Sequence, residues 1–236
     1  MKKLTGVFLF STIFFSIHSY ASMNIYPMET GITQNGVSEL QVSSKSADVQ
    51  FIKVTEKKII NTGTKDEKEV DVDMASGDGL TITPQKLALT AGGTRIVRLI
   101  ALKPPAQETT WRVYFEGVTE DKFNNIENAG KKEAASVGMN IVWGVLVHVA
   151  PQHVSVDLKY NTDDNSISND GTIRTEVSEI GECSTDTNCS WKKYRVNVYP
   201  GTRIKTDSFH FKPGGVYKVK FYNWISQKNE ETTLHS

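Results

Sequence analysis

The amino-acid sequence predicts an all-β protein built from two antiparallel β-sandwiches. Short runs of alternating or apolar residues recur along most of the chain, and turn signals such as "TQNG", "TAGG" and "KPGG" separate them. No segment shows sustained helical periodicity, which leaves strands as the main element. Strands at this spacing, joined by tight turns, are typical of sandwiches.

The chain begins with a segment typical of a secretory signal peptide. Lys2 and Lys3 precede the apolar run "LTGVFLFSTIFFSI", and "SYA" supplies small residues before a cleavage point at Ser22. We therefore expect residues 1–21 to direct export and to be removed. A membrane anchor, the alternative, fits less well because the apolar run is short and a good cleavage site follows it.

The charge of the mature chain bears on its partners. Removing residues 1–21 takes away two of the 27 basic residues and none of the 27 acidic ones, which leaves a net charge of −2. This charge gives no indication of a nucleic-acid partner. No later apolar stretch approaches the ~20 residues of a membrane span, so we expect a soluble mature protein with no stable membrane insertion.

Strand candidates lie on both sides of Pro151. Because a proline ends a buried strand and stiffens the connection that follows, we place a domain boundary there, with domains at 22–150 and 151–236. The candidates before it are "SELQVSSK", "DVQFIKVTEKKI", "EVDVDM", "LTITPQKLALTAGGTRIVRLIAL" and "TWRVYFEGVT", and those after it are "HVSVDLKY", "TIRTEVSEI", "WKKYRVNVYP" and "VYKVKFYNW".

The longest candidate strand is "SVGMNIVWGVLVHVAP", residues 136–151. Its first half alternates, with Val137, Met139 and Ile141 apolar, and its second half is apolar at nearly every position. At ~3.3 Å per residue the positions before Pro151 would reach ~50 Å, whereas ordinary strands have about five or six residues. The charged, Asn-rich segment 120–136 before it is predicted to be an exposed loop.

The two cysteines, Cys183 and Cys189, predict a disulfide. An even number of cysteines at short spacing in an exported chain is most simply explained by a bridge that pins a hairpin-like loop. A zinc site would need further ligands, and the mature histidines are scattered without metal spacing. A redox site would favour C-x-x-C. We expect no metal and no cofactor.

Catalytic signatures are absent from the sequence. It has no G-x-S-x-G, H-E-x-x-H, P-loop or dinucleotide-binding motif. The acidic pairs in "DVDM" and "TDDN" are better explained as strand-face and turn residues than as an acid/base couple. We therefore expect a protein that is not an enzyme.

Several motifs together resemble the periplasmic chaperones of chaperone-usher pili. They are "TPQKLALTAGGTRIVRL", then "WRVYFEGV", a long polar loop, and a long apolar strand that ends in proline. More narrowly, "NIYP", "KKIINTGT", "TPQKL" and "WRVYFE" are similar to the alternate branch that serves class 5 fimbriae. The resemblance extends over essentially the whole mature chain and implies two immunoglobulin-like domains in a boomerang arrangement.

The resemblance assigns a task to the long strand. The family lends alternate apolar side chains of its seventh strand to a fimbrial subunit that lacks its last strand, which is β-strand addition. Counting back from Pro151, the donor residues fall on Val137, Met139 and Ile141, the same positions that the alternation marks. The alternative is that these three side chains face the interior of their own domain. Trp143 has the same parity, and it either extends the donor motif or begins the part packed in the protein's own core.

The resemblance also shows one departure, at the site that holds the subunit's C-terminal carboxylate. Better-known members use two basic residues there, but this chain has Leu146 at one position and no Arg or Lys near Glu29 at the other. His148 and Arg112 are the candidate anchors. Two alternatives stay open, a satisfied interdomain histidine for His148 and a surface or ion-pair residue for Arg112.

Arg98 in "RIVRL" and Glu108 in "AQETTW" match, within a residue or two, an arginine and a glutamate of the family's interdomain ion-pair network. We therefore expect Arg98 and Glu108 to hold the domain angle. Either residue could instead be an ordinary surface charge.

Together these features predict a periplasmic chaperone whose partners are fimbrial subunits and an outer-membrane usher. Whether the chain self-associates without a client is left open. Two other classes remain, a fimbrial subunit or adhesin and a secreted carbohydrate-binding β-sandwich. The first would need an incomplete sandwich, and the second would need clustered exposed aromatic residues, whereas the four tryptophans are spread along the chain.

Overall fold

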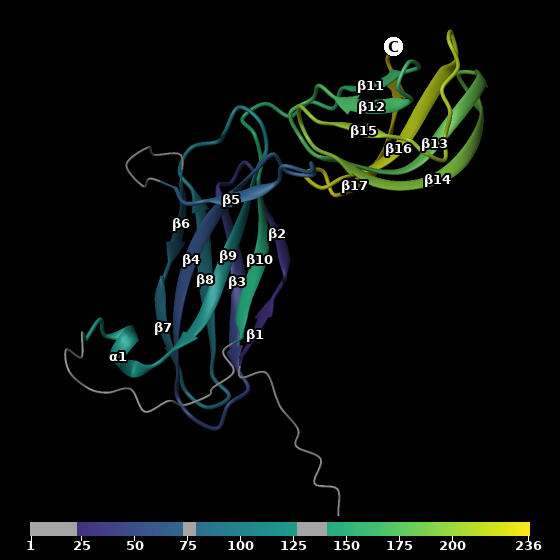
Figure 1. Ribbon diagram of the computed structural model, residues 1–236. Coiled ribbons are helices and arrows are strands. Elements are labelled where there is room, and N and C mark those ends of the chain that lie inside the picture. Colours follow the sequence, from purple (N-terminus) through teal and green to yellow (C-terminus); the bar gives the residue numbers. More distant parts are fainter. Residues whose placement is uncertain (1–22, 73–78, 127–140) are drawn as a thin grey trace, which may run out of the picture.

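A computed structural model describes residues 23–72, 79–126 and 141–236. The predicted signal peptide, Val137 and Met139 lie outside these residues. The regular secondary structure of the described chain is almost entirely β-strand, and it forms two sandwiches that meet at an angle (Figure 1). The predicted fold class, two immunoglobulin-like sandwiches in a boomerang arrangement, is confirmed. Among the described residues, no helix is long and apolar enough to cross a membrane.

One sheet of the first sandwich has four strands in the order β1-β3-β8-β6. Neighbouring strands are antiparallel, and alternate side chains point into the sandwich. For example, Leu40 and Val42 are fully buried, whereas Glu39 and Gln41 beside them are exposed. The strands are β1 (Met23–Tyr26), β3 (Val37–Ser44), β8 (Thr94–Ala101) and β6 (Leu80–Thr83).

The facing sheet has the order β2-β10-β9-β4-β5, and β7 also pairs with β4. Only β2 and β10 are parallel to each other among these pairs, because the chain crosses from the first sheet to this one between β1 and β2. The strands are β2 (Glu29–Ile32), β10 (Val142–Val149), β9 (Thr109–Val118), β4 (Gln50–Ile60), β5 (Lys68–Val70) and β7 (Lys86–Leu89).

The second sandwich pairs a sheet of three strands, β11-β12-β15, with a sheet of four, β14-β13-β16-β17. Cys183 and Cys189 lie directly opposite each other on β13 and β14 and are joined by the predicted disulfide. The strands are β11 (Leu158–Asn161), β12 (Ser166–Asn169), β15 (Arg203–Lys205), β13 (Thr175–Thr185), β14 (Asn188–Val198), β16 (Val216–Asn223) and β17 (Lys228–Leu234).

Each sandwich has its own hydrophobic core. Buried side chains of the first cluster come from the strands between Met23 and Val149, and those of the second lie between Leu158 and Leu234. Burial of each large apolar side chain contributes ~1.5–3 kcal/mol, so each core is the main stabilising contribution to its own sandwich. Between β10 and β11 the chain passes through Pro151, where we expected the boundary.

A short helix, α1 (Glu120–Phe123), lies in the segment expected to be an irregular loop. The Thr119 side chain accepts a hydrogen bond from the backbone N–H of Lys122, which caps the helix. Four residues are too few for helical periodicity to be visible in the sequence. The helix lies beside β4 and β7, at the end of the first sandwich that is far from the second (Figure 1).

Candidate functional site at the β10 edge and the domain junction

The strand β10 has a complete neighbour on one side and an incomplete one on the other. It pairs with β9 along its whole length, from Val142 opposite Glu116 to Val149 opposite Thr109. On its other side it pairs with β2 only from Leu146 to Val149. Within the part of the chain that the structure describes, the outer backbone edge of residues 142–145 therefore has no strand partner.

Burial decreases along β10 toward its first residues, where the edge has no partner. Val145, Val147 and Val149 are buried in the first core, whereas Ile141 and Val142 are 38% and 48% exposed. An unpaired backbone edge flanked by exposed apolar side chains is a ready template for another strand. The geometry of this end of β10 is therefore suited to β-strand addition.

Trp143, predicted as a possible fourth donor residue, is partly buried and packs against the first core. This position agrees with the second of its two interpretations, in which it begins the part of the strand kept in the protein's own sandwich. Its indole Nε1 is buried without a hydrogen-bond partner. Of the predicted donor residues, only Ile141 and Trp143 lie within the described residues.

Arg112 lies on the outer face of the sheet, opposite Leu146. Its guanidinium Nε is 2.8 Å from Oε1 of Glu69, and the Tyr114 hydroxyl donates to the other oxygen of Glu69 at 2.6 Å. Gly144 leaves room for the Arg112 side chain, because a Cβ there would make a tight contact of 3.1 Å with it. Arg112 is thus already paired with an acidic residue of its own domain.

His148 lies at the domain junction and is almost fully buried, with 1% of its side chain exposed. Its ring Nδ1 is 3.1 Å from Oε1 of Glu108, and its Nε2 is 3.2 Å from Oε1 of Glu29. An imidazolium carries an N–H on each ring nitrogen and can face both carboxylates favourably, whereas a neutral imidazole has only one N–H. This environment matches the alternative that the sequence left open, an interdomain histidine whose partners lie within the protein.

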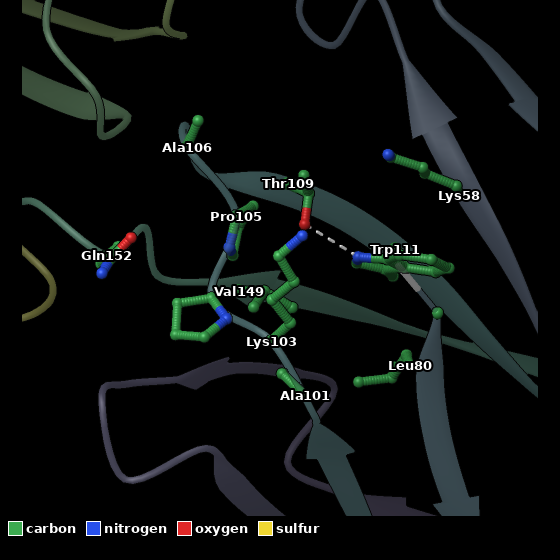
Figure 2. Close-up of a pocket in the computed structure, with 12 residues that line it drawn as sticks. Lys58, Leu80, Ala101, Lys103, Pro105, Ala106, Thr109, Trp111, Val149 and Gln152 are labelled. Atoms are coloured by element: carbon green, nitrogen blue, oxygen red, sulfur yellow. Dashed lines mark hydrogen bonds between the residues drawn. The ribbon is translucent and has the colours of Figure 1, made fainter. Parts of the chain in front are cut away.

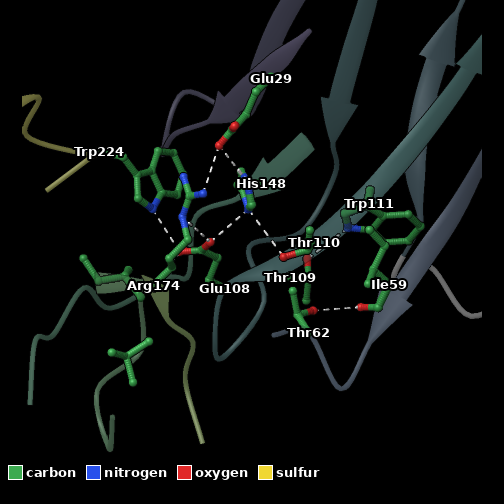
Figure 3. A network of polar contacts seen from close by, with 12 residues as sticks. Glu29, Ile59, Thr62, Glu108, Thr109, Thr110, Trp111, His148, Arg174 and Trp224 are labelled. Carbon is green, nitrogen blue, oxygen red and sulfur yellow. Dashed lines mark hydrogen bonds and ion pairs between the residues drawn. The ribbon is translucent and has the colours of Figure 1, made fainter. Parts of the chain in front are cut away.

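The second domain completes this cluster with Arg174 and Trp224 (Figure 3). The Arg174 guanidinium Nη1 is 2.9 Å from Oε1 of Glu29, and its Nε is 3.8 Å from Oε1 of Glu108. The other oxygen of Glu108 accepts hydrogen bonds from the Trp224 indole at 2.9 Å and from the Arg174 backbone at 2.8 Å. Glu108 belongs to the first domain and accepts hydrogen bonds from two donors of the second, so it links the two domains.

Charges in this cluster are balanced. Two carboxylates, one guanidinium and one imidazolium sum to zero, which is the condition for burying such groups without a large desolvation cost. Burial by itself lowers the pKa of His148, but hydrogen bonds to Glu108 and Glu29 outweigh it and raise the pKa above its ordinary value. The hydrogen bond from His148, with Arg174 acting in the same direction against burial, lowers the pKa of Glu29 to about 2.

Stability should therefore depend on pH through His148. Because the pKa of His148 is raised in the folded state, its contribution to the free energy of unfolding is complete below the ordinary pKa of 6.5. This contribution is lost as the pH rises through the folded-state pKa. The contribution of Glu29 has the opposite sign, present above its ordinary pKa of 4.5 and lost as the pH falls toward about 2. We expect the urea midpoint to decline from mildly acidic to alkaline pH.

His148→Gln should flatten this alkaline decline, whereas Gln at the exposed His153 should leave it unchanged. Equal pH profiles for wild type and His148→Gln would contradict the assignment of the imidazolium.

The prediction that Arg98 and Glu108 form an interdomain pair is wrong for Arg98. The register of β3 and β8 places Arg98 opposite Glu39, and its Nε is 2.9 Å from the Glu39 carboxylate on the exposed outer face of the sheet. Glu108 does lie at the junction, but its cationic partners are His148 and Arg174.

Sequence reasoning missed the two residues that the second domain contributes. Arg174 follows the turn "SNDG" and Trp224 follows the strand "VYKVKFYN", and neither position has a local signal that distinguishes it from a surface or core residue. Gly31 on β2 is a third missed residue. A Cβ there would be 2.3 Å from the Trp224 ring, so only glycine permits this close packing of the domains.

A pocket of about 330 Å³ lies at the junction end of the first sandwich (Figure 2). Its walls include Leu80, Trp111, Val149, Pro105 and Gln152, and the Trp111 indole donates to Thr109 at 3.0 Å within it. We assign no ligand to this pocket.

Comparisons with known proteins relate the chain to proteins of fimbriae and pili. No protein-family model matches the chain. The chain is 39% identical to a CFA/I fimbrial subunit of Escherichia coli over 214 residues, which cover 87% of each chain. It is 36% identical to a CS1 fimbrial subunit of Escherichia coli over 194 residues, 79% of this chain and 80% of that one.

Solved structures include the class 5 fimbriae chaperone CfaA. The chain is 31% identical to it with a TM-score of 0.71, over 91% of this chain and 99% of that chain. A chain of the chaperone–tip adhesin complex of CFA/I fimbriae biogenesis is also 31% identical, with a TM-score of 0.68 and the same coverage. The CsuC–CsuE complex of Acinetobacter baumannii, at 12% identity and a TM-score of 0.54 over 91% and 99%, is similar in fold alone.

Proposed function

Because the chain belongs to the class 5 branch of the chaperones of chaperone-usher fimbriae, we propose that it is a periplasmic chaperone for fimbrial subunits. It binds subunits by donor-strand complementation and delivers them to an outer-membrane usher. Residues 1–21 are its export signal, and residues 22–150 and 151–236 are its two domains. Val137, Met139 and Ile141 are its donor residues.

The observation that carries this proposal is the open edge of β10. Residues 142–145 lack a strand neighbour on the β2 side among the described residues. Ile141 is exposed, and in the sequence it is the third of the alternate apolar residues that begin at Val137. An added strand would gain ladder hydrogen bonds from this edge, while alternate side chains would fill the subunit's pockets. Three side chains at ~1.5–3 kcal/mol each would add several kcal/mol to the backbone pairing.

The carboxylate anchor remains a prediction. His148 and Arg112 already have acidic partners, so a subunit carboxylate would have to displace Glu29 or Glu69 to reach them. Glu29 is the more accessible of the two, with 52% of its side chain exposed. An exchange at Glu29 would place the new carboxylate between His148 and Arg174.

A fimbrial subunit is the second candidate function, because the two curated relatives carry that name. A subunit that needs a donor strand has an incomplete sandwich with an exposed groove. Here the first sandwich has both sheets and a continuous buried core of its own. The high structural similarity to a chaperone over nearly its full length also favours the chaperone.

Co-expression in the periplasm tests the proposed function. The probe is the major subunit of the fimbria encoded with this chain, produced with and without the chaperone. We expect the subunit to accumulate in soluble form only with the chaperone and to co-purify with it as a complex of one copy each. A subunit equally soluble and abundant without the chaperone would contradict the proposal.

A further inference from the structure

The turn between β4 and β5, residues 61–67, extends from the first sandwich to the second domain (Figure 1). Its Gly63 lies against the ring of Tyr199, which directly follows β14. A Cβ added to Gly63 would be 2.5 Å from the Tyr199 ring, well inside the ~3.5 Å of a carbon–carbon contact. This is another glycine–aromatic contact between the domains, beside that of Gly31 with Trp224.

Hydrogen bonds within the turn hold it in one shape. The Gly63 N–H donates to the Glu67 carboxylate at 2.7 Å, and the Asn61 amide donates to the backbone carbonyl of Asp66 at 3.2 Å. The Thr64 hydroxyl donates to the Asn61 carbonyl at 2.7 Å. A turn closed by its own side chains is stiffer than one without such bonds, so its tip moves together with β4 and β5.

Tyr199 is held as firmly on the second domain. Its backbone carbonyl accepts hydrogen bonds from the N–H and the hydroxyl of Thr202, at 3.1 and 2.8 Å. The buried Asn169 side chain donates to the carbonyl of Val198, the preceding residue, at 2.8 Å. Burial at the junction raises the pKa of the Tyr199 hydroxyl, and the nearby Arg174 guanidinium opposes this shift. The ring therefore lies beside the charged cluster.

The two glycine–aromatic contacts lie at opposite ends of a row across the first sandwich. Gly31 is on β2 and Gly63 follows β4, and the sheet places β10 and β9 between these two strands. At ~4.8 Å per strand, the contacts are about 14 Å apart. His148 on β10 and Glu108 just before β9 lie between them, with the charged cluster. Contacts at both ends of such a row oppose rotation of the second domain about the long axis of the first.

We propose that the turn 61–67 fixes the twist of the second domain relative to the first, with Gly63 and Tyr199 as the positioning residues. The twist is the rotation of the second domain about the long axis of the first sandwich. The charged cluster and Trp224 hold the β2 side of the row, and the Tyr199 contact holds the β4 side. The inference concerns the client-free protein and goes beyond the proposed function.

The twist has a consequence for client binding, which rests on the proposed function. The open edge of β10 ends at Val145, and the domain junction begins at His148. At ~3.3 Å per residue, a subunit strand added to this edge would end about 10 Å from the second domain. The two sheets of a sandwich alone lie ~10 Å apart, so the rest of the subunit would contact the second domain as well. The twist would then decide how well the subunit fits.

Gly63→Asn tests the proposal, with the domain orientation measured by residual dipolar couplings in the client-free protein. Gly63 has a φ of +75°, and Asn accepts this left-handed conformation, as Asn61 and Asn125 already do in this chain. Restoring a carbon–carbon distance of ~3.5 Å from 2.5 Å moves the Tyr199 ring by about 1 Å. Over a row of about 14 Å, we expect a rotation of at least about 4°.

Gly92→Asn is the matched control, because Gly92 also has a positive φ, +64°. Among the described residues, a Cβ there would meet no atom within 4 Å beyond its chain neighbours, so the orientation should not change. Tyr199→Ala removes the ring, and Gly63→Asn in this background should cause no rotation. Tyr199 is not part of the second core, so we expect the domain to stay folded, which the unfolding midpoint checks.

Subunit binding gives the second readout. If Tyr199→Ala leaves the binding-competent orientation in about 10 to 30% of molecules, the affinity for the fimbrial subunit should fall about threefold to tenfold. In the same variant, the couplings of the two domains should no longer fit one common alignment, because the domains would move independently.

The same domain orientation in Gly63→Asn and wild type overturns the proposal, and so does an equal rotation with and without the Tyr199 ring. Failure of the proposed function is distinguishable, because the orientation is measured without a client. In that case the rotation would be found while neither wild type nor variant bound the subunit.

Discussion

Replacing Val137, Met139 and Ile141 together with Ser is expected to abolish the accumulation of soluble fimbrial subunit during co-expression. Each substitution removes an apolar side chain that would fill a pocket of the subunit, at ~1.5–3 kcal/mol each. Losing several kcal/mol lowers affinity by about a thousandfold or more, since ~1.4 kcal/mol corresponds to tenfold. This is the largest effect that we predict for any variant.

The matched control changes three exposed apolar residues away from the β10 edge. Val49, Leu102 and Val216 are 54%, 72% and 44% exposed, and their joint replacement by Ser should leave the subunit soluble. The measurement is the amount of subunit in the soluble periplasmic fraction and in the purified complex. Wild-type amounts with the donor-strand variant would show that these three residues are not the donors.

Glu108→Ala is expected to destabilise the protein by about 3–5 kcal/mol, the usual effect of removing one partner from a buried charge cluster. Its carboxylate is 1% exposed and has partners on both domains, so its loss leaves the Trp224 indole and the Arg174 backbone without their acceptor. The cluster also keeps two cations with only Glu29 to balance them.

Glu39→Ala is the control for Glu108→Ala, because it breaks an ion pair whose two side chains are more than half exposed. Exposed pairs contribute about 0–1 kcal/mol, so this variant should unfold close to wild type. Urea unfolding measures both free energies, and small-angle X-ray scattering reports whether Glu108→Ala changes the domain angle. If Glu108→Ala and Glu39→Ala had the same free energy of unfolding, the buried cluster would not be what stabilises the domain junction.

The sequence was most informative where a local period determines structure. Alternation identified β9, and a nearly continuous apolar run identified the buried half of β10, because inward positions such as Trp111, Val113 and Val147 must be apolar. An apolar pattern could not show whether Trp143 is donated to a subunit or packed in the protein's own core, since both roles require an apolar side chain. Only the strand's neighbours decide that question, and they come from distant segments.

The polar cluster and the position of α1 could be predicted only in part. Glu108 was placed at the junction by resemblance, but its partner Arg174 lies 66 residues later in the chain, and nothing in the spacing connects them. Arg98 was misassigned because its partner depends on the register of β3 and β8. The helix α1 depends on Lys53 and Lys86, which read as ordinary strand-face charges in the sequence.

Amide hydrogen exchange of the purified chaperone–subunit complex tests the central claim most directly. If β10 lends its open end to the subunit, the amides of residues 137–145 should become as protected in the complex as those in the middle of β9. Exchange of these amides at the same rate in the complex and in the client-free protein, with protection appearing elsewhere, would contradict donor-strand complementation by this segment.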